Sequence, residues 1–260
     1  MTDERPGAGR LPVTLGVSLK AYLGVRESAE WAAAIGAQAS AHPAVRSGAV
    51  EVFALPALPA LAAVSATLAG SPVAYGAQDL FWEDRGPFTG AVSGADLAEL
   101  GCRYVEIGHA ERRAVFGEGE EVSRRKLAAA VRNGLTPVVC VGERSRQSAE
   151  RAAEVCAAQL ESVLAEAEEV GDLVIAYEPE WAIGRAEPAP PDHVVDVVRA
   201  MKRRIADLPV TGRVPVIYGG SAGPGLLATI AAGADGLFLG RFAHDPAAVA
   251  VMLDEAAAIR

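Results

Sequence analysis

Short apolar runs recur along the chain, and longer alanine-rich segments with helical spacing separate most of them. Each run has four to seven residues and is bounded by glycine, proline or polar residues, which is typical of strands buried on both faces of a sheet. The pattern predicts eight strands, over Val13–Ser18, Ala49–Leu55, Pro72–Ala77, Arg103–Ile107, Thr136–Val141, Asp172–Tyr177, Val214–Tyr218 and Gly236–Leu239.

The segment Ser148–Val170 illustrates the helical spacing between two of these strands. Gly171 follows it directly, and glycine is common just beyond the end of a helix. We therefore expect one helix over the whole segment. The apolar residues that share a face of this helix are Cys156, Leu160, Val163, Leu164 and Ala167.

Alternating strands and helices indicate a parallel sheet with right-handed crossovers. Eight units in 260 residues leave about 32 residues for each strand and its helix. This length favours a closed (β/α)8 barrel over an open doubly wound sheet, although periodicity alone does not separate the two. Because no linker or break in composition divides the chain, we expect a polar tail over residues 1–12 and a single barrel domain over residues 13–260.

The charge balance limits the classes of ligand. The chain carries 24 Lys and Arg residues against 33 Asp and Glu residues, a net charge of −9, and this argues against nucleic acid as a partner. An anionic substrate must then be held by local groups, because the overall field repels it.

Cysteine usage and the apolar windows predict a cytoplasmic protein without a membrane span. The three cysteines, Cys102, Cys140 and Cys156, have no C-x-x-C spacing, which argues against a disulfide framework and a cysteine zinc site. Met1–Arg10 lacks the apolar run of a signal peptide. The most apolar window, Ala54–Gly70, is interrupted by proline and hydroxyl residues and is too short to span a bilayer.

Chemically active residues follow the predicted strands. In a closed barrel, the loops after the strands form the active-site face. Only three of the 24 basic residues are lysines, so a lysine directly after the first strand is informative. The segments that follow strands are Ser18–Lys20, Gly108–Arg113, Cys140–Glu143, Glu178–Gly184, Gly219–Ser221 and Gly240–Arg241.

Two of these residues have a structural and a catalytic interpretation. His109 follows a glycine and would commonly cap a helix or lie on the surface. Glu178 precedes a proline and could begin a turn, but an apolar strand and a Trp-containing loop flank it, a setting that raises a carboxyl pKa toward that of a working base. The remaining histidines have no metal-pair spacing, so we expect no metal site.

Glycine-rich turns after the last two strands predict an anion site. Gly219-Gly220-Ser221 and Gly240 can present backbone N–H groups to a phosphate, and barrels of this type often bind phosphate after strands seven and eight. Alternatively, these glycines only make tight turns. A rival motif, G-x-G-x-x-A over residues 223–228, is a poor dinucleotide fingerprint, because Pro224 disturbs the turn and the next acid, Asp235, precedes its strand.

Five runs in register resemble the triosephosphate isomerase family. They occur in that family's order, and the resemblance extends from about Val13 to the end of the chain. The resemblance implies a TIM barrel. The runs are Tyr104–Arg113 (YVEIGHAERR), Val139–Glu143 (VCVGE), Ala176–Gly184 (AYEPEWAIG), Tyr218–Ser221 (YGGS) and Asp235–Gly240 (DGLFLG).

The resemblance implies a role for each central residue. Glu178 would move a proton between two substrate carbons, and His109 would be the neutral electrophile that polarises the carbonyl. Lys20 would stabilise the enediolate and the phosphate, with Glu111 as its partner. Cys140 would support the site from the neighbouring strand.

The family also implies a lid and a phosphate cradle. Residues 179–189 would close over the intermediate, with Gly184 donating an amide to the phosphate. Ser221, Gly220 and Gly240 would complete the cradle. No metal or redox cofactor is required by this chemistry.

The chain departs from the family around the substrate. Ser18 stands where the family usually has Asn, and serine there resembles relatives that isomerise erythrulose phosphates. In the lid, Arg185-Ala186-Glu187 replaces Thr-Gly-Lys, and residues 188–191 are stiffened by proline. Arg241 replaces a glycine of the phosphate loop, where it either contacts phosphate or points away.

Three hypotheses follow. The first is interconversion of dihydroxyacetone phosphate and glyceraldehyde 3-phosphate, which would place the protein in glycolysis and gluconeogenesis. The second is the same proton transfer on a four-carbon ketose phosphate such as erythrulose phosphate. The third is a non-catalytic barrel that binds a phosphorylated metabolite.

The resemblance further implies a homodimer. The segment from Asp79 to Ser93 resembles the family's projecting third loop, which inserts into the neighbouring subunit. Its aromatic residues, Phe81, Trp82 and Phe88, would be costly to expose on a monomer. Alternatively, these rings fold back onto their own barrel.

Overall fold

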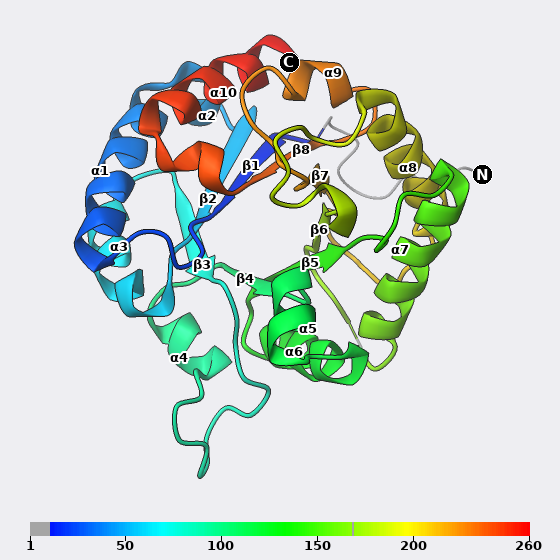
Figure 1. Cartoon of the computed structure of the whole chain (residues 1–260). Coiled ribbons are helices and arrows are strands. Elements are labelled where there is room, and N and C mark those ends of the chain that lie inside the picture. Colours follow the sequence, from blue (N-terminus) through cyan, green and yellow to red (C-terminus); the bar gives the residue numbers. More distant parts are fainter. Residues whose placement is uncertain (1–10, 168) are drawn as a thin grey trace.

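The computed structural model describes residues 11–167 and 169–260, and within them the sheet is a closed barrel of parallel strands (Figure 1). Each strand pairs with its neighbours in sequence, and β8 pairs with β1 to close the ring. The predicted (β/α)8 fold is confirmed, and every strand lies within its predicted run. The strands are β1 (Val13–Ser18), β2 (Val50–Leu55), β3 (Ala74–Ala77), β4 (Tyr104–Ile107), β5 (Thr136–Val141), β6 (Val174–Tyr177), β7 (Val216–Tyr218) and β8 (Gly236–Leu239).

Helices surround the barrel as an outer ring (Figure 1). They are α1 (Val25–Ala41), α2 (Pro43–Arg46), α3 (Leu61–Leu68), α4 (Gly94–Glu99), α5 (Ala110–Phe116), α6 (Glu120–Arg132), α7 (Ala149–Leu164), α8 (Pro191–Arg204), α9 (Leu227–Ile230) and α10 (Pro246–Ala258). Short 3-10 turns lie at η1 (Leu58–Ala60), η2 (Glu180–Ala182) and η3 (Arg241–His244). No helix in the described ranges is both long and apolar enough to cross a membrane.

Helix α7 ends earlier than its sequence predicts. Ser148 caps its N-terminus by accepting a hydrogen bond from the Arg151 N–H, but the helix stops at Leu164. Beyond it, Val170 forms an isolated parallel bridge with Val210. The predicted helix to Val170 is therefore wrong, because the extended backbone at Val170 pairs with a neighbouring segment instead. The predicted tail falls mostly on residues 1–10, which lie outside the described residues.

Two apolar layers hold the barrel. The larger layer lies between the strands and the surrounding helices. The smaller one fills the barrel interior, where Phe53 stacks on Tyr104 at 4.4 Å between ring centroids and contacts Phe238 at 6.2 Å. Because side chains alternate along a strand, the inward position of Tyr104 places Glu106 on the same inner side, one layer closer to the carboxyl end of β4.

The segment between β3 and α4 projects away from the barrel (Figure 1). Its aromatic rings contact each other, with centroid distances of 4.1 Å for Phe81–Trp82 and 4.9 Å for Phe81–Phe88. The Arg125 guanidinium of α6 lies 4.3 Å over the Trp82 ring. Two of the rings are thus half-buried on their own chain, whereas Phe88 stays 39% exposed.

The close approach of β3 and β4 leads to a prediction about the free energy of unfolding. A Cβ at Gly76 would lie 1.9 Å from the Tyr104 carbonyl oxygen, so Gly76→Ala must push the two strands apart. We expect a loss of about 3 kcal/mol in the free energy of unfolding, measured by urea denaturation. The control is Gly171→Ala, where a Cβ would meet no atom within 4 Å and stability should change by less than about 0.5 kcal/mol. Equal stability of the two variants would contradict this packing.

Candidate active site

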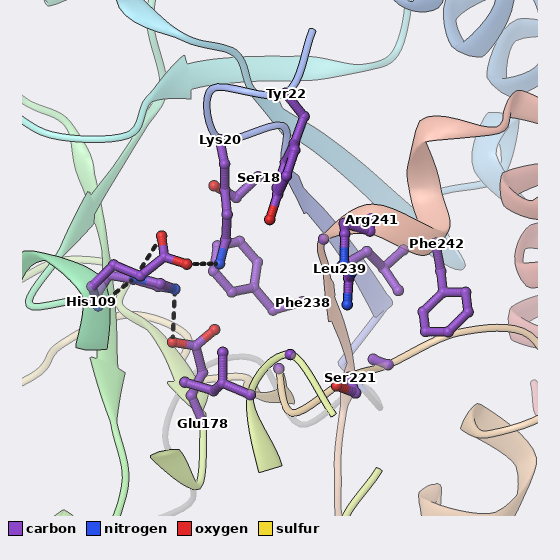
Figure 2. A pocket seen from close by; sticks show the side chains of 16 residues that line it. Ser18, Lys20, Tyr22, His109, Glu178, Ser221, Phe238, Leu239, Arg241 and Phe242 are labelled. Atoms are coloured by element: carbon purple, nitrogen blue, oxygen red, sulfur yellow. Dashed lines mark hydrogen bonds and ion pairs between the residues drawn. The ribbon is translucent and has the colours of Figure 1, made fainter. Parts of the chain in front are cut away.

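A cavity of about 300 Å³ opens at the carboxyl ends of the strands (Figure 2). Its walls come from segments that follow β1, β4, β6, β7 and β8, as expected for the active-site face of a barrel. The lining residues are Ser18, Lys20, Tyr22, His109, Glu111, Glu178, Ile183, Gly184, Gly219, Ser221, Ala222, Phe238, Leu239, Gly240, Arg241 and Phe242.

His109 both caps a helix and faces the cavity. Its Nδ1 accepts a hydrogen bond of 3.1 Å from the Glu111 N–H at the start of α5. The proton of the neutral ring is therefore on Nε2, which lies 3.4 Å from Glu178 Oε2. Burial, together with the nearby Lys20 charge, lowers the pKa of His109 to about 4. The two interpretations of this residue are compatible, since the capping bond fixes the tautomer that faces the site.

Glu178 is a buried carboxyl with an unused acceptor. Its backbone N–H donates to the Val141 carbonyl at 2.8 Å, which fixes it beside β5, and Oε2 has no hydrogen-bond partner among the described residues. Gly219 leaves space for the side chain, because a Cβ there would lie 2.7 Å from Glu178 Cγ. Burial raises the pKa of Glu178 to about 8, and the Glu106 charge adds to this effect. Such a carboxylate is poised to accept a proton.

Lys20 lies across the cavity from Glu178 (Figure 2). Its Nζ is 2.6 Å from Glu111 Oε1, the partner expected for it. Burial is the largest single effect and lowers the pKa of Lys20, but the hydrogen bond to Glu111 and the charges of Glu111, Glu178 and Glu106 together outweigh it, so the pKa is raised. Its backbone has a φ of +50°, an uncommon conformation for a residue other than glycine, and such strain is often found at functional sites.

Glu106 belongs to this cluster, although the sequence alone predicts no role for it. Its Oε2 accepts a hydrogen bond of 3.0 Å from Ser18 Oγ, and its Oε1 lies 3.9 Å from His109 Nε2. Burial raises the pKa of Glu106 to about 7. The buried Cys140 thiol approaches the same Oε1 at 4.0 Å, which places this predicted supporting residue below the cavity. The sequence signal was an acid inside the four-residue apolar strand YVEI, in phase with inward-facing Tyr104.

The lid segment, residues 179–189, is fastened at both ends. Near its start, Trp181 Nε1 donates to Glu143 Oε1 at 2.7 Å, and at its end the Ala189 N–H donates to Tyr218 Oη at 2.8 Å. Ser221 Oγ contacts the Ala182 and Arg185 carbonyls, both at 3.0 Å. The Ser221 hydroxyl therefore ties down the lid.

In the lid, the left-handed backbone conformation falls at a glycine. Gly184 has a φ of +69°, and no lid residue other than this glycine has a positive φ within residues 179–189. The Ala186 substitution thus falls at a position where alanine is not strained.

The predicted phosphate cradle is only partly at the cavity. Gly184, Ser221, Gly240 and Arg241 line it, and the Arg241 side chain lies on the same side as Ser221 (Figure 2). Gly220 is not part of the lining. Instead, its carbonyl accepts a hydrogen bond of 2.6 Å from Tyr218 Oη.

The rival dinucleotide motif binds its own chain. The Gly225 N–H donates to Glu255 Oε1 at 2.6 Å, so this amide is already occupied. The other histidines lie apart, with His42 near Asp254, His193 near Glu143 and His244 near Tyr22. Within residues 11–167 and 169–260, no group of three His, Cys, Asp or Glu side chains is placed to hold a metal ion.

Comparison with known proteins agrees with this geometry. A family model of triosephosphate isomerase matches residues 13–256. The L-erythrulose-1-phosphate isomerase of Pectobacterium atrosepticum is 53% identical over 247 residues, which cover 94% of this chain and 95% of the relative. The triosephosphate isomerase of Moorella thermoacetica is 39% identical over 219 residues, covering 82% and 88%. That of Roseiflexus castenholzii is 41% identical over 180 residues, covering 67% and 71%. The chain therefore belongs to the triosephosphate isomerase family of aldose–ketose isomerases.

Proposed function

We propose that the enzyme isomerises a four-carbon ketose phosphate by proton transfer through an enediolate. The single observation that carries the proton transfer is the 3.4 Å separation of His109 Nε2 and Glu178 Oε2 at one cavity. One group is a buried carboxyl with raised pKa, and the other is a neutral imidazole with its proton facing inward. This pair provides a base for a carbon-bound proton and a donor for the adjacent oxygen.

The proposed reaction assigns one task to each group. Glu178 Oε2 removes a proton from the carbon next to the carbonyl and returns it to the former carbonyl carbon. His109 donates its Nε2 proton to the carbonyl oxygen and takes one from the neighbouring hydroxyl. The Lys20 ammonium stabilises the negative charge of the enediolate. One C–H bond breaks and another forms, so the atoms balance without a co-reactant.

The phosphate end of the substrate has a separate set of contacts in this proposal. The amides of Gly184, Ser221 and Gly240 surround the phosphate, and Arg241 adds a positive charge at the same end. A net charge of −9 makes such local groups necessary for a dianionic substrate. The lid excludes water from the enediolate.

The choice of substrate rests on similarity and on pocket size. The relative that is 53% identical over nearly the whole of both chains bears the name L-erythrulose-1-phosphate isomerase. The short side chain of Ser18 leaves more room at the cavity than an asparagine would. In a four-carbon ketose 1-phosphate, the carbon beyond the carbonyl carries a secondary hydroxyl, so the product of proton transfer is a second ketose phosphate.

The three-carbon pair, dihydroxyacetone phosphate and glyceraldehyde 3-phosphate, is the second candidate. It is favoured by the relatives at 39–41% identity that bear the name triosephosphate isomerase. On this substrate the same base acts on a terminal carbon, and the product is an aldose.

A comparison of kcat/KM on both ketose phosphates tests the proposal. We expect the four-carbon substrate to be preferred, because Ser18 and the cavity accommodate the added hydroxymethyl group. Glu178→Gln should lower kcat on either substrate by about 10³-fold or more, since an amide cannot accept the carbon-bound proton. Phosphate affinity, measured with an unreactive phosphate ester, should stay within about threefold as the control.

Three outcomes would contradict parts of this proposal. Preference for dihydroxyacetone phosphate would overturn the four-carbon substrate. A Glu178→Gln variant with kcat within about tenfold of the parent would overturn the base. Tight binding of both substrates without turnover would instead support a non-catalytic barrel.

The pH dependence of kcat/KM tests the ionisation of the base. Ionised Glu178 is the active form, and its raised pKa of about 8 predicts that kcat/KM falls as pH drops through 8. Its charged neighbours are Glu106, Lys20 and Glu111. Glu106→Gln removes one negative charge near Glu178, so the fall in kcat/KM should occur at a lower pH than in the parent. A parent profile that is flat from pH 6.5 to 9, above the phosphate's own titration near 6, would contradict this ionisation.

We further propose a cytoplasmic homodimer. The three cysteines, Cys102, Cys140 and Cys156, are buried free thiols, which suits a reducing compartment. The projecting segment from Asp79 to Ser93 and its exposed Phe88 suit insertion into a second copy (Figure 1).

Sedimentation equilibrium tests the dimer. The parent should sediment at twice the chain mass of 26.8 kDa at micromolar concentration. Phe88→Asp should weaken the dimer by about tenfold or more in Kd, because it places a charge in an apolar contact. Val251→Asp, at an exposed apolar residue of α10 outside this segment, is the control and should leave the dimer intact. A parent that sediments as one chain would contradict the assembly.

A further inference from the structure

Ser18 lines the cavity, and its hydroxyl forms a buried polar pair with Glu106, which lies next to it but is not among the lining residues. Ser18 ends β1 and Glu106 lies on β4, so the two side chains meet across the barrel interior with 3.0 Å between Ser18 Oγ and Glu106 Oε2. Both residues are almost fully buried, with exposed fractions of 3% and 4%. The proposed mechanism assigns no proton transfer to either residue.

The apolar surroundings impose a free-energy cost on the buried Glu106 carboxyl. Phe53, Tyr104 and Phe238 fill the barrel directly below and beside it. An apolar residue at position 106 would continue this layer without the free-energy cost of burying a carboxyl. The position therefore carries a polar group for a reason other than packing.

One oxygen of Glu106 has capacity for another donor. Oε2 accepts the Ser18 hydroxyl, but the donor recorded for Oε1 is the Cys140 thiol at 4.0 Å, a long contact with a weak donor. His109 Nε2 lies 3.9 Å from the same oxygen, beyond hydrogen-bond distance. A substrate hydroxyl beside His109 would fill this gap.

Ser18 lies away from the predicted phosphate end of the cavity. In Figure 2, Ser18 is in the upper part of the view and Ser221 in the lower part, with His109 and Glu178 to the left. A substrate anchored by its phosphate near Ser221, with its reacting carbons at His109 and Glu178, directs its remaining carbon toward Ser18. That carbon exists in a four-carbon ketose phosphate and is missing from a three-carbon one.

We propose that Ser18 and Glu106 form the subsite for the terminal hydroxymethyl group of the substrate, with Glu106 Oε1 accepting a hydrogen bond from its hydroxyl. This assignment rests on the four-carbon function proposed above. Ser18 orients the carboxyl through Oε2 and leaves Oε1 directed to the substrate. Glu106 is then a specificity-determining residue, since its contact is with a group that takes no part in proton transfer.

The test measures kcat/KM on the four-carbon and three-carbon ketose phosphates for the parent, Glu106→Leu and Glu106→Gln. Glu106→Leu should lower kcat/KM on the four-carbon substrate about 10- to 100-fold, the effect of losing one charged hydrogen bond. At pH 9, where Glu178 is mostly ionised in every variant, the ratio of the four-carbon to the three-carbon kcat/KM should fall by the same factor, because the three-carbon substrate lacks the hydroxymethyl group. Glu106→Gln keeps an acceptor oxygen, so it should retain more of the four-carbon preference than leucine does.

Glu143→Gln is the matched control for loss of a buried carboxylate. Glu143 is fully buried at the end of β5, and its carboxylate binds Tyr177 and Trp181. This change should alter both substrates by the same factor and leave their ratio unchanged. Thermal unfolding establishes that each variant is folded, and if the leucine variant is not, the ratio measured with Glu106→Gln decides.

The outcomes separate the two proposals. A parent that prefers the three-carbon substrate overturns the four-carbon function and, with it, this subsite. A parent that prefers the four-carbon substrate, together with equal losses on both substrates in the Glu106 variants, overturns the subsite alone. A selective loss on the four-carbon substrate supports the assignment.

Discussion

The withdrawal of Glu178 and His109 from water is the constraint on which the rest of the site depends. Burial has opposite effects on the two pKa values, raising that of the carboxyl to about 8 and lowering that of the imidazole to about 4. Between these values His109 is neutral, while Glu178 changes charge close to physiological pH. A strong base and a neutral proton donor can therefore face each other without collapsing into a stable ion pair.

The barrel supplies this environment through its interior packing. Phe53, Tyr104 and Phe238 close the space below the cavity, and Gly142 allows its backbone to pass close to that of Glu178, since a Cβ there would lie 1.9 Å from the Glu178 carbonyl oxygen. Above the cavity, the lid is held by Tyr218 and by the Ser221 hydroxyl. In the proposed mechanism, the reacting groups therefore lie at strand ends, and the segment that opens and closes is the lid that covers them.

Much of this arrangement could be predicted from the sequence. Buried strands have a clear apolar pattern. The closure of eight such strands into a barrel places Lys20, His109 and Glu178 at the same end of the barrel. Helix α7 was predicted too long because its pattern continues past Leu164, while a long-range pairing at Val170 sets the actual end. Glu106 was missed as a site residue because its partners, Ser18 and Cys140, lie 88 and 34 residues away from it in the sequence. Ser221 was expected to bind phosphate. Its hydroxyl instead contacts two lid carbonyls, a contact that depends on how the lid folds.

The protonation state of His109 tests most directly whether burial sets the charges of the two facing groups. In protein labelled with ¹⁵N-histidine, with the signals assigned by a His109→Gln variant, the ring should stay neutral from pH 5 to pH 9, with its proton on Nε2. This follows from the Glu111 N–H that binds Nδ1 and from a pKa of about 4. A ring that titrates near its ordinary pKa of about 6.5, or that carries its proton on Nδ1, would contradict the account.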